Sequence, residues 1–267
     1  MEQHGKNPNK NIYAIIPARY SSTRLGGKLL LPLGGKPLIL RTVEQALKAR
    51  NVGRVIVATD NEKILNVMRA SGNEAILTSA AHQSGSDRIA EVAQSLPENS
   101  IIVNVQGDEP LIPPTTIERA VEAMIADDAA EIVTTCEKIE NARDVSSGDV
   151  VKVITDINGY ALYFSRSPIP FPREAVKKHG DLEAALVNEP NLINLFRKHT
   201  GLYVYRREFL LKFTQYKQTI LEKTEMLEQL RALENGARIR VVEVAESSIG
   251  VDTAEDYERA KKMLKTI

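Results

Sequence analysis

Short apolar runs rich in β-branched residues alternate with amphipathic helical patterns through the first half of this 267-residue chain. The alternation constrains the fold strongly, because a strand, a covering helix and a second strand in the same direction form a parallel unit. We therefore predict an α/β fold with a mostly parallel central sheet and flanking helices. The expected strands are 12–17, 54–59, 74–77, 101–106 and 131–136, and the expected helices are 37–49, 86–96 and 115–126, the last opened by Pro114.

The pattern changes after Asp149. Residues 150–155 and 160–165 favour strands, and the turn Asp156-Ile157-Asn158-Gly159 between them predicts a hairpin. Residues 168–198 are rich in proline and polar side chains, so we expect a surface excursion with one short helix near 181–185. The remaining predicted elements are a strand at 201–205, helices at 206–213 and 223–234, a strand at 238–245, and a helix at 253–264 with Thr253 as N-cap and Asp256 in the capping-box position.

Composition excludes several kinds of partner. Basic and acidic residues number 35 each, so no surplus of positive charge attracts nucleic acid or anionic lipid. Aromatic residues make up only 5% of the chain, and no apolar run is long enough to span a membrane. The single cysteine, Cys136, fits a reducing compartment and is expected in the core. We expect a cytoplasmic protein that binds neither nucleic acid nor membrane.

A loop with small residues, hydroxyls and cations follows the first predicted strand and reads IPARYSSTRLGGK from Ile16 to Lys28. Ligands of open parallel sheets bind beyond the carboxyl ends of the strands, which places this loop where a nucleotide lies. Arg24 and Lys28 can neutralise charge on a pyrophosphate leaving group. The loop matches neither G-x-x-x-x-G-K-[ST] nor G-x-G-x-x-G, and a solvated basic surface loop is the alternative interpretation.

Two aspartates are positioned to bind a metal ion. Asp108 follows the apolar run 101–103 in the motif VNVQGDEP, and Asp252 directly precedes the last predicted helix. Magnesium needs only one or two protein carboxylates when phosphate oxygens supply further ligands. The alternatives are a turn-forming role for Asp108 and a helix-dipole role for Asp252.

A third motif, HQSGSDR, opens the helix predicted at 86–96. Ser86 has the residue type of an N-cap, and Asp87 favours the positive end of the helix. Gln83, Ser84 and Arg88 remain as residues able to hydrogen-bond a base edge and a ribose.

Together these motifs resemble the 3-deoxy-manno-octulosonate (Kdo) cytidylyltransferases, also called CMP-Kdo synthetases. The resemblance rests on IIPARYSSTRLGGK, VATD, HQSGSDR, VNVQGDEP, VKV, ALYFSR, HTGLYVY, EMLEQLRAL and GVDTAED, which keep the family's order from Tyr13 to Leu264. It implies a glycosyltransferase-A-like nucleotidyltransferase fold and a homodimer. It also implies magnesium-dependent transfer of CMP from CTP to Kdo for lipopolysaccharide biosynthesis. On this basis residues 1–11 form a flexible tail and 12–267 a single domain, in which about 150–235 serve dimerisation and sugar binding.

The resemblance also implies roles for individual residues. The catalytic set is Arg24 and Lys28 at the CTP phosphates, with Asp108 and Asp252 at magnesium. The rest of the nucleotide pocket comprises Ala18, Arg19, Ser22, Arg88 and Gln106. The residues expected around the acidic sugar are Arg166, His199, Tyr203, Glu228 and Gln229. Gly26 and Leu29 replace prolines of the family pattern, so we expect a more mobile phosphate loop.

Three alternative functions would each require a different substrate or a different set of motifs. A cytidylyltransferase for 8-amino-Kdo or a sialic acid is the nearest alternative. A glycosyltransferase of the same fold normally has an Asp-x-Asp motif, which neither VATD nor QGD supplies. A non-catalytic nucleotide-binding protein is expected to lose the charged site residues, whereas all four members of the catalytic set are present.

Overall fold

The computed structural model describes residues 11–20, 25–245 and 248–264. Nearly all of the tail predicted at 1–11 lies outside the described residues, as do Ser22 and Arg24 of the predicted nucleotide pocket. Seven strands of the central sheet follow the order β11-β7-β10-β6-β1-β4-β5. Their bounds are β1 Ile12–Ala18, β4 Arg54–Thr59, β5 Glu74–Leu77, β6 Ile101–Asn104, β7 Ile132–Lys138, β10 Arg197–Arg206 and β11 Ile239–Glu243.

The sheet is mostly parallel, as predicted. β1 pairs in parallel with β4 and β6, β4 with β5, and β7 with β11. β10 lies antiparallel between β6 and β7, and it joins the two parallel groups into one sheet. The carboxyl ends of β1 and β6 therefore lie side by side at one edge, where a ligand is expected.

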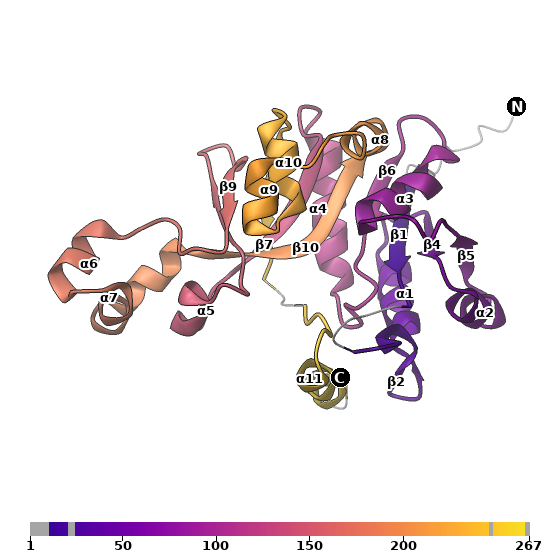
Figure 1. Ribbon diagram of the computed structural model, residues 1–267, viewed down its shortest axis with the longest axis horizontal. Helices are drawn as coiled ribbons and strands as arrows, with labels where there is room; N and C mark the ends of the chain where they lie inside the picture. The colour runs from indigo at the N-terminus through magenta and orange to yellow at the C-terminus, as the bar shows by residue number, and fades with distance from the viewer. Residues whose placement is uncertain (1–10, 21–24, 246–247, 265–267) are drawn as a thin grey trace, which may run out of the picture.

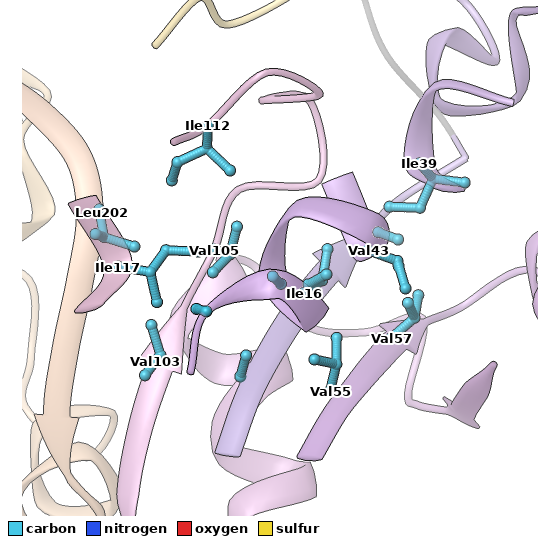
Figure 2. Close-up of a cluster of buried hydrophobic side chains, with 14 of the residues drawn as sticks. Ile16, Ile39, Val43, Val55, Val57, Val103, Val105, Ile112, Ile117 and Leu202 are labelled. Carbon is cyan, nitrogen blue, oxygen red and sulfur yellow. The ribbon is translucent and has the colours of Figure 1, made fainter. Parts of the chain in front are cut away.

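Helices cover both faces of the sheet (Figure 1). α1 (Leu38–Lys48), α2 (Glu62–Ala70), α4 (Pro114–Ala126) and α11 (Ala254–Leu264) contribute to one core, while α3 (Gly85–Gln94) and α8 (Arg207–Phe213) contribute to the other. β1 serves both cores, because its successive side chains point to opposite faces. Figure 2 shows the first core, in which Ile16 of β1 lies among Ile39, Val43 and Val57. Cys136 is buried, as expected.

A smaller region extends from the sheet and carries its own core. β8 (Lys152–Thr155) and β9 (Ala161–Ser165) form the predicted hairpin, in which Asp156 Oδ1 accepts hydrogen bonds from two turn amides. Beyond it lie α6 (Arg173–His179), α7 (Leu182–Asn188) and a 3-10 helix η2 (Pro190–Leu195). Figure 1 shows α6 and α7 at the opposite end of the long axis from α2 and β5. The short helix predicted near 181–185 is confirmed as α7. The rest of the expected surface excursion was wrong, because α6 and η2 also form there and Leu186 and Phe196 bury against Val145 of α5 (Ala142–Ser146).

Two further helix predictions differ from the structure. The helix predicted at 223–234 is broken into α9 (Ile220–Glu225) and α10 (Glu228–Glu234), because Met226 adopts a left-handed conformation with φ 54°. Helix α2 was not predicted. In contrast, α11 begins after the predicted N-cap, and Thr253 and Asp256 exchange the hydrogen bonds of a capping box. No helix in the described part of the chain is long and apolar enough to cross a membrane.

Candidate active site

Three charged residues from remote segments meet beyond the carboxyl end of β6. Lys28, which begins the 3-10 helix η1 (Lys28–Leu30), donates from Nζ to Asp108 Oδ2 at 2.6 Å and to Asp252 Oδ1 at 2.7 Å. Burial lowers the pKa of Lys28, but the charges and hydrogen bonds of the two aspartates outweigh this effect and raise it overall. Lys28 is therefore a fully charged ammonium held between two carboxylates.

Tight backbone packing places the two aspartates together. Gly107 lies so close to β1 that a Cβ atom there would stand 2.9 Å from the Pro17 carbonyl oxygen, so a larger residue would displace Asp108. The Thr42 hydroxyl also donates to the Gly107 carbonyl at 3.0 Å. The Asp108 carbonyl accepts from the Val251 amide at 2.9 Å, and this backbone bond brings Asp252 beside Asp108.

The paired carboxylates have the donor chemistry of a divalent-cation site. Both direct an oxygen at one cationic atom, Lys28 Nζ, and so converge on a common point. Within the described residues, no group of three or more His, Cys, Asp or Glu side chains is arranged to hold a metal ion. A magnesium ion between Asp108 and Asp252 would therefore take its other oxygen ligands from phosphate or water.

Other residues predicted for the nucleotide pocket lie at the same edge. Ala18 ends β1 and is buried, and the next residue, Arg19, donates from Nη2 to the His82 carbonyl at 2.8 Å. Gln106 lies between Asn104 and the Gly201 carbonyl, with its Nε2 at 3.4 Å from an oxygen of each. These contacts link the loops after β1 and β6 to the motif before α3 and to β10.

The HQSGSDR motif is arranged differently from the sequence prediction. The N-cap of α3 is Ser84, which exchanges capping-box hydrogen bonds with Asp87, so the assignment to Ser86 was wrong. Ser86 instead donates to Glu228 Oε2 at 2.7 Å. Arg88 is fully buried and donates to Thr78 Oγ1 at 2.5 Å and Asp60 Oδ2 at 2.7 Å. Its guanidinium has no exposed surface for a base or ribose to contact, because helical spacing turns it into the protein.

Two of the residues predicted for the sugar lie on β10. His199 Nε2 is 2.9 Å from Thr134 Oγ1, and its ring packs edge-on against Phe164 at 4.9 Å between centroids. Desolvation lowers the pKa of His199 to about 3, so this imidazole is neutral near pH 7. The ring of Tyr203 lies 5.4 Å from that of His199, and burial raises the pKa of its hydroxyl. Both side chains therefore offer neutral hydrogen-bonding groups.

The other three predicted sugar residues come from the adjoining hairpin and helix. Arg166 follows β9, which lies beside α10 (Figure 1). Glu228 Oε1 accepts from Arg231 Nη2 at 2.7 Å, while desolvation raises the pKa of its carboxyl group. The Gln229 side chain is 5% exposed, and its Nε2 has no hydrogen-bond partner within the described residues. A buried amide with an unused donor is suited to a polar ligand.

Glu109 directly follows Asp108, and no role was predicted for it from the sequence. Burial raises its pKa to about 7, and the neighbouring charge of Asp108 adds to the effect. A Cβ atom on Gly201 of β10 would lie 3.3 Å from Glu109 Oε1, so this carboxyl group faces the strand that carries His199 and Tyr203. Its position in VNVQGDEP is visible in the sequence, whereas its desolvation depends on β10.

The sequence and the structure are both similar to known cytidylyltransferases. A family model described as cytidylyltransferase matches residues 13–239. The chain is 51% identical over 254 residues to the 3-deoxy-manno-octulosonate cytidylyltransferase of Trichlorobacter lovleyi, covering 95% of this chain and 98% of the relative. It is 49% identical to the enzyme of the same name from Geobacter sulfurreducens, covering 96% of this chain and all of the relative.

Solved structures agree with this grouping. A CMP:2-keto-3-deoxy-manno-octonic acid synthetase complexed with CTP superposes with a TM-score of 0.85 and 38% identity over 96% of this chain and 98% of the other. A cytidylyltransferase from Leptospira borgpetersenii, 17% identical, shares the fold with a TM-score of 0.61 over 96% of this chain and 87% of the other. The resemblance seen in the motifs is confirmed: the chain belongs to the cytidylyltransferase family, among the 3-deoxy-manno-octulosonate cytidylyltransferases.

Proposed function

We propose that this protein transfers CMP from CTP to the anomeric hydroxyl of Kdo, giving CMP-Kdo and pyrophosphate for lipopolysaccharide biosynthesis. The observation that carries the proposal is the convergence of Lys28, Asp108 and Asp252 at the nucleotide edge of the sheet. It occurs in a chain about half identical, over nearly its whole length, to relatives named for this reaction.

In the proposed step, the anomeric hydroxyl loses its proton to solvent, and its oxygen forms a bond to the α-phosphorus of CTP. The bond from that phosphorus to the oxygen bridging to the β-phosphate breaks, and pyrophosphate leaves with the electron pair. Positioning and charge neutralisation supply most of the catalysis in such transfers. Lys28 exchanges its carboxylate partners for phosphate oxygens as CTP binds, and Arg24 adds a second positive charge.

Asp108 and Asp252 are the residues that would hold magnesium. When bound, the ion neutralises phosphate charge and lowers the pKa of a coordinated hydroxyl. Glu109 lies next to Asp108 and faces β10, the strand that carries His199 and Tyr203. Its raised pKa suits it to hold a proton near neutral pH.

On the sugar side, Arg166 pairs with the carboxylate of Kdo, while His199, Tyr203, Glu228 and Gln229 hydrogen-bond its hydroxyls. His199 acts as a neutral partner rather than an acid, because its pKa lies far below neutral pH. On the nucleotide side, Ala18, Arg19, Ser22 and Gln106 line the pocket. Arg88 supports this pocket indirectly through Asp60 and Thr78.

We also infer that the protein is a cytoplasmic homodimer whose partner subunit binds the region of about 150–235. Exposed apolar side chains gather there, including Leu162, Phe171, Val187 and Leu195. Leu162 and Leu195 line a cavity of about 620 Å³ between the hairpin and β11. Light scattering after size exclusion tests the dimer, and a mass equal to the 29.6 kDa monomer contradicts it.

Pyrophosphate release tests the reaction. Each of the four ribonucleoside triphosphates is combined with Kdo, 8-amino-Kdo or sialic acid, with magnesium and with a chelator. We expect release only with CTP and magnesium, and fastest with Kdo. A preference for 8-amino-Kdo or sialic acid would reassign the acceptor, and no release with any pair would indicate a non-catalytic protein.

A further inference from the structure

Lys152 is a lysine whose burial is unusual for its charge. Its side chain has no exposed surface, although lysine is almost never fully buried without a partner. All three donors of its ammonium end on backbone carbonyls: Ser147 O at 2.8 Å, Val150 O at 2.6 Å and Arg166 O at 2.5 Å. The ammonium thus ties the chain after α5, the start of β8 and the end of β9 to one point.

Arg166 is restrained on several sides. Lys152 holds its carbonyl, and its amide donates to Glu225 Oε2 at 2.9 Å. Its guanidinium donates from Nε to the Glu225 carbonyl at 2.7 Å and from Nη1 to the Gly148 carbonyl at 2.8 Å. Both partners of the guanidinium are neutral carbonyls, and Nη2 makes no hydrogen bond within the described part of the chain. Arg166 therefore presents an oriented guanidinium that makes no ion pair of its own with any described residue and keeps its Nη2 donors unused.

Glu225 connects this arrangement to α10. It ends α9, and its carboxylate also accepts from Ser165 Oγ at 2.6 Å. The next residue, Met226, has the left-handed conformation that turns the chain into α10, where Glu228 and Gln229 lie. The group formed by Lys152, Ser165, Arg166 and Glu225 therefore sets the relative position of β9 and α10.

We propose that Lys152 is a positioning residue for the acidic substrate: by holding the Arg166 carbonyl, its ammonium orients the free Nη2 edge of Arg166 toward the substrate carboxylate. An ammonium suits this task because it donates three bonds in a tetrahedral arrangement, whereas methionine donates none. The proposal rests on the proposed function, since it takes the ligand of Arg166 to be the carboxylate of a sugar acid.

Steady-state kinetics of Lys152→Met, with each substrate varied in turn, provide the first test. We expect KM for Kdo to rise roughly tenfold, because a small misplacement of a positioning group weakens binding strongly. KM for CTP should stay within about twofold of wild type. Lys36→Met is the matched control, because Lys36 is an exposed lysine that pairs with Glu44 outside the region of about 150–235, and both of its KM values should be unchanged. Melting temperatures are recorded for every variant.

A double-mutant cycle with Arg166→Ala shows whether Lys152 acts through Arg166. In the Arg166→Ala background, Lys152→Met should change KM for Kdo by less than about twofold, since the group that it positions is gone. If the effects instead multiply, or if Lys152→Met lowers the melting temperature and leaves KM for Kdo unchanged, the positioning role is wrong.

Glu225→Gln provides a second route if Lys152→Met does not fold. The substitution keeps the size of the side chain but removes one acceptor, so a rise in KM for Kdo alone is again expected. If KM for CTP and KM for Kdo rise by the same factor, or if neither changes from wild type, the proposal is wrong. Failure of the proposed function appears differently: wild type itself then releases no pyrophosphate with CTP and Kdo.

Discussion

The two polar clusters of the site have opposite charge balances. Around Lys28, one ammonium lies between two carboxylates, and the cluster carries excess negative charge. Around Arg166, a guanidinium and the buried Lys152 ammonium contact mainly neutral carbonyls, with Glu225 as their carboxylate neighbour, so positive charge is in excess. The first arrangement favours a cation and the second an anion. This difference matches the proposed ligands, a metal-bound triphosphate and a sugar acid.

Removing a carboxylate from the negative cluster should have the largest effect. Asp108→Asn keeps the size of the side chain but removes a metal-binding charge. We expect kcat/KM with magnesium to fall by more than about a hundredfold, because even indirect partners of a metal site contribute about 10–100-fold. Circular dichroism should show an unchanged fold. Near-normal turnover would remove Asp108 from the mechanism.

Removing the cation of the positive cluster should affect only the sugar. A hydrogen bond to a charged group contributes about 1.5–3 kcal/mol, so Arg166→Ala should raise KM for Kdo by about 10–100-fold. KM for CTP should hardly change. Equal losses for both substrates would show that the two clusters are not separate sites.

Removing the ammonium from the negative cluster should strengthen cation binding. We expect Lys28→Met to bind Mn²⁺ about tenfold more tightly than wild type without nucleotide, because a cation no longer competes with a hydrogen-bonded charge. Electron paramagnetic resonance of free Mn²⁺ measures this affinity. Lys36→Met, which removes an exposed lysine paired with Glu44, serves as the control. Weaker Mn²⁺ binding by Lys28→Met would contradict a shared cation position.

The smallest effect concerns His199. Because its pKa is about 3, His199→Asn should leave the shape of the pH–activity profile unchanged between about pH 6 and 9. The free energy of unfolding of wild type should instead fall as the pH is lowered below about 6.5. The unfolded chain binds a proton near pH 6.5 and the folded chain only near 3, so wild type loses at most about 1.4 kcal/mol per pH unit within this range. Denaturant unfolding at pH 7 and pH 5 should show that His199→Asn lacks this loss.

Much of the fold could be predicted from the sequence because its signals are local. β4 and β5 have the predicted bounds, and β1, β6 and β7 differ by only one or two residues at either end. β1, β4, β6 and β7 bury both faces, which makes their apolar runs continuous. The second half was predicted less well. The break at Met226 and the helix α6, which packs against α7, depend on contacts with other elements, which no local periodicity reports.

The sequence by itself determined the order along the chain of the nine described strands in the central sheet, the family, and the motifs that contain Lys28, Asp108 and Asp252, but not helices α2, α5 and α6. Residue type and short-range spacing carry that information, since they set secondary structure and the chemistry available at each strand end. Only the tertiary structure decided which groups each of the buried polar side chains contacts. In the structure, Arg88 is buried against Asp60, the N-cap of α3 is Ser84 rather than the predicted Ser86, and Lys152 lies among three carbonyls. Burial and long-range pairing arise when segments far apart in the chain pack together, and the charge balance of each cluster follows from that packing.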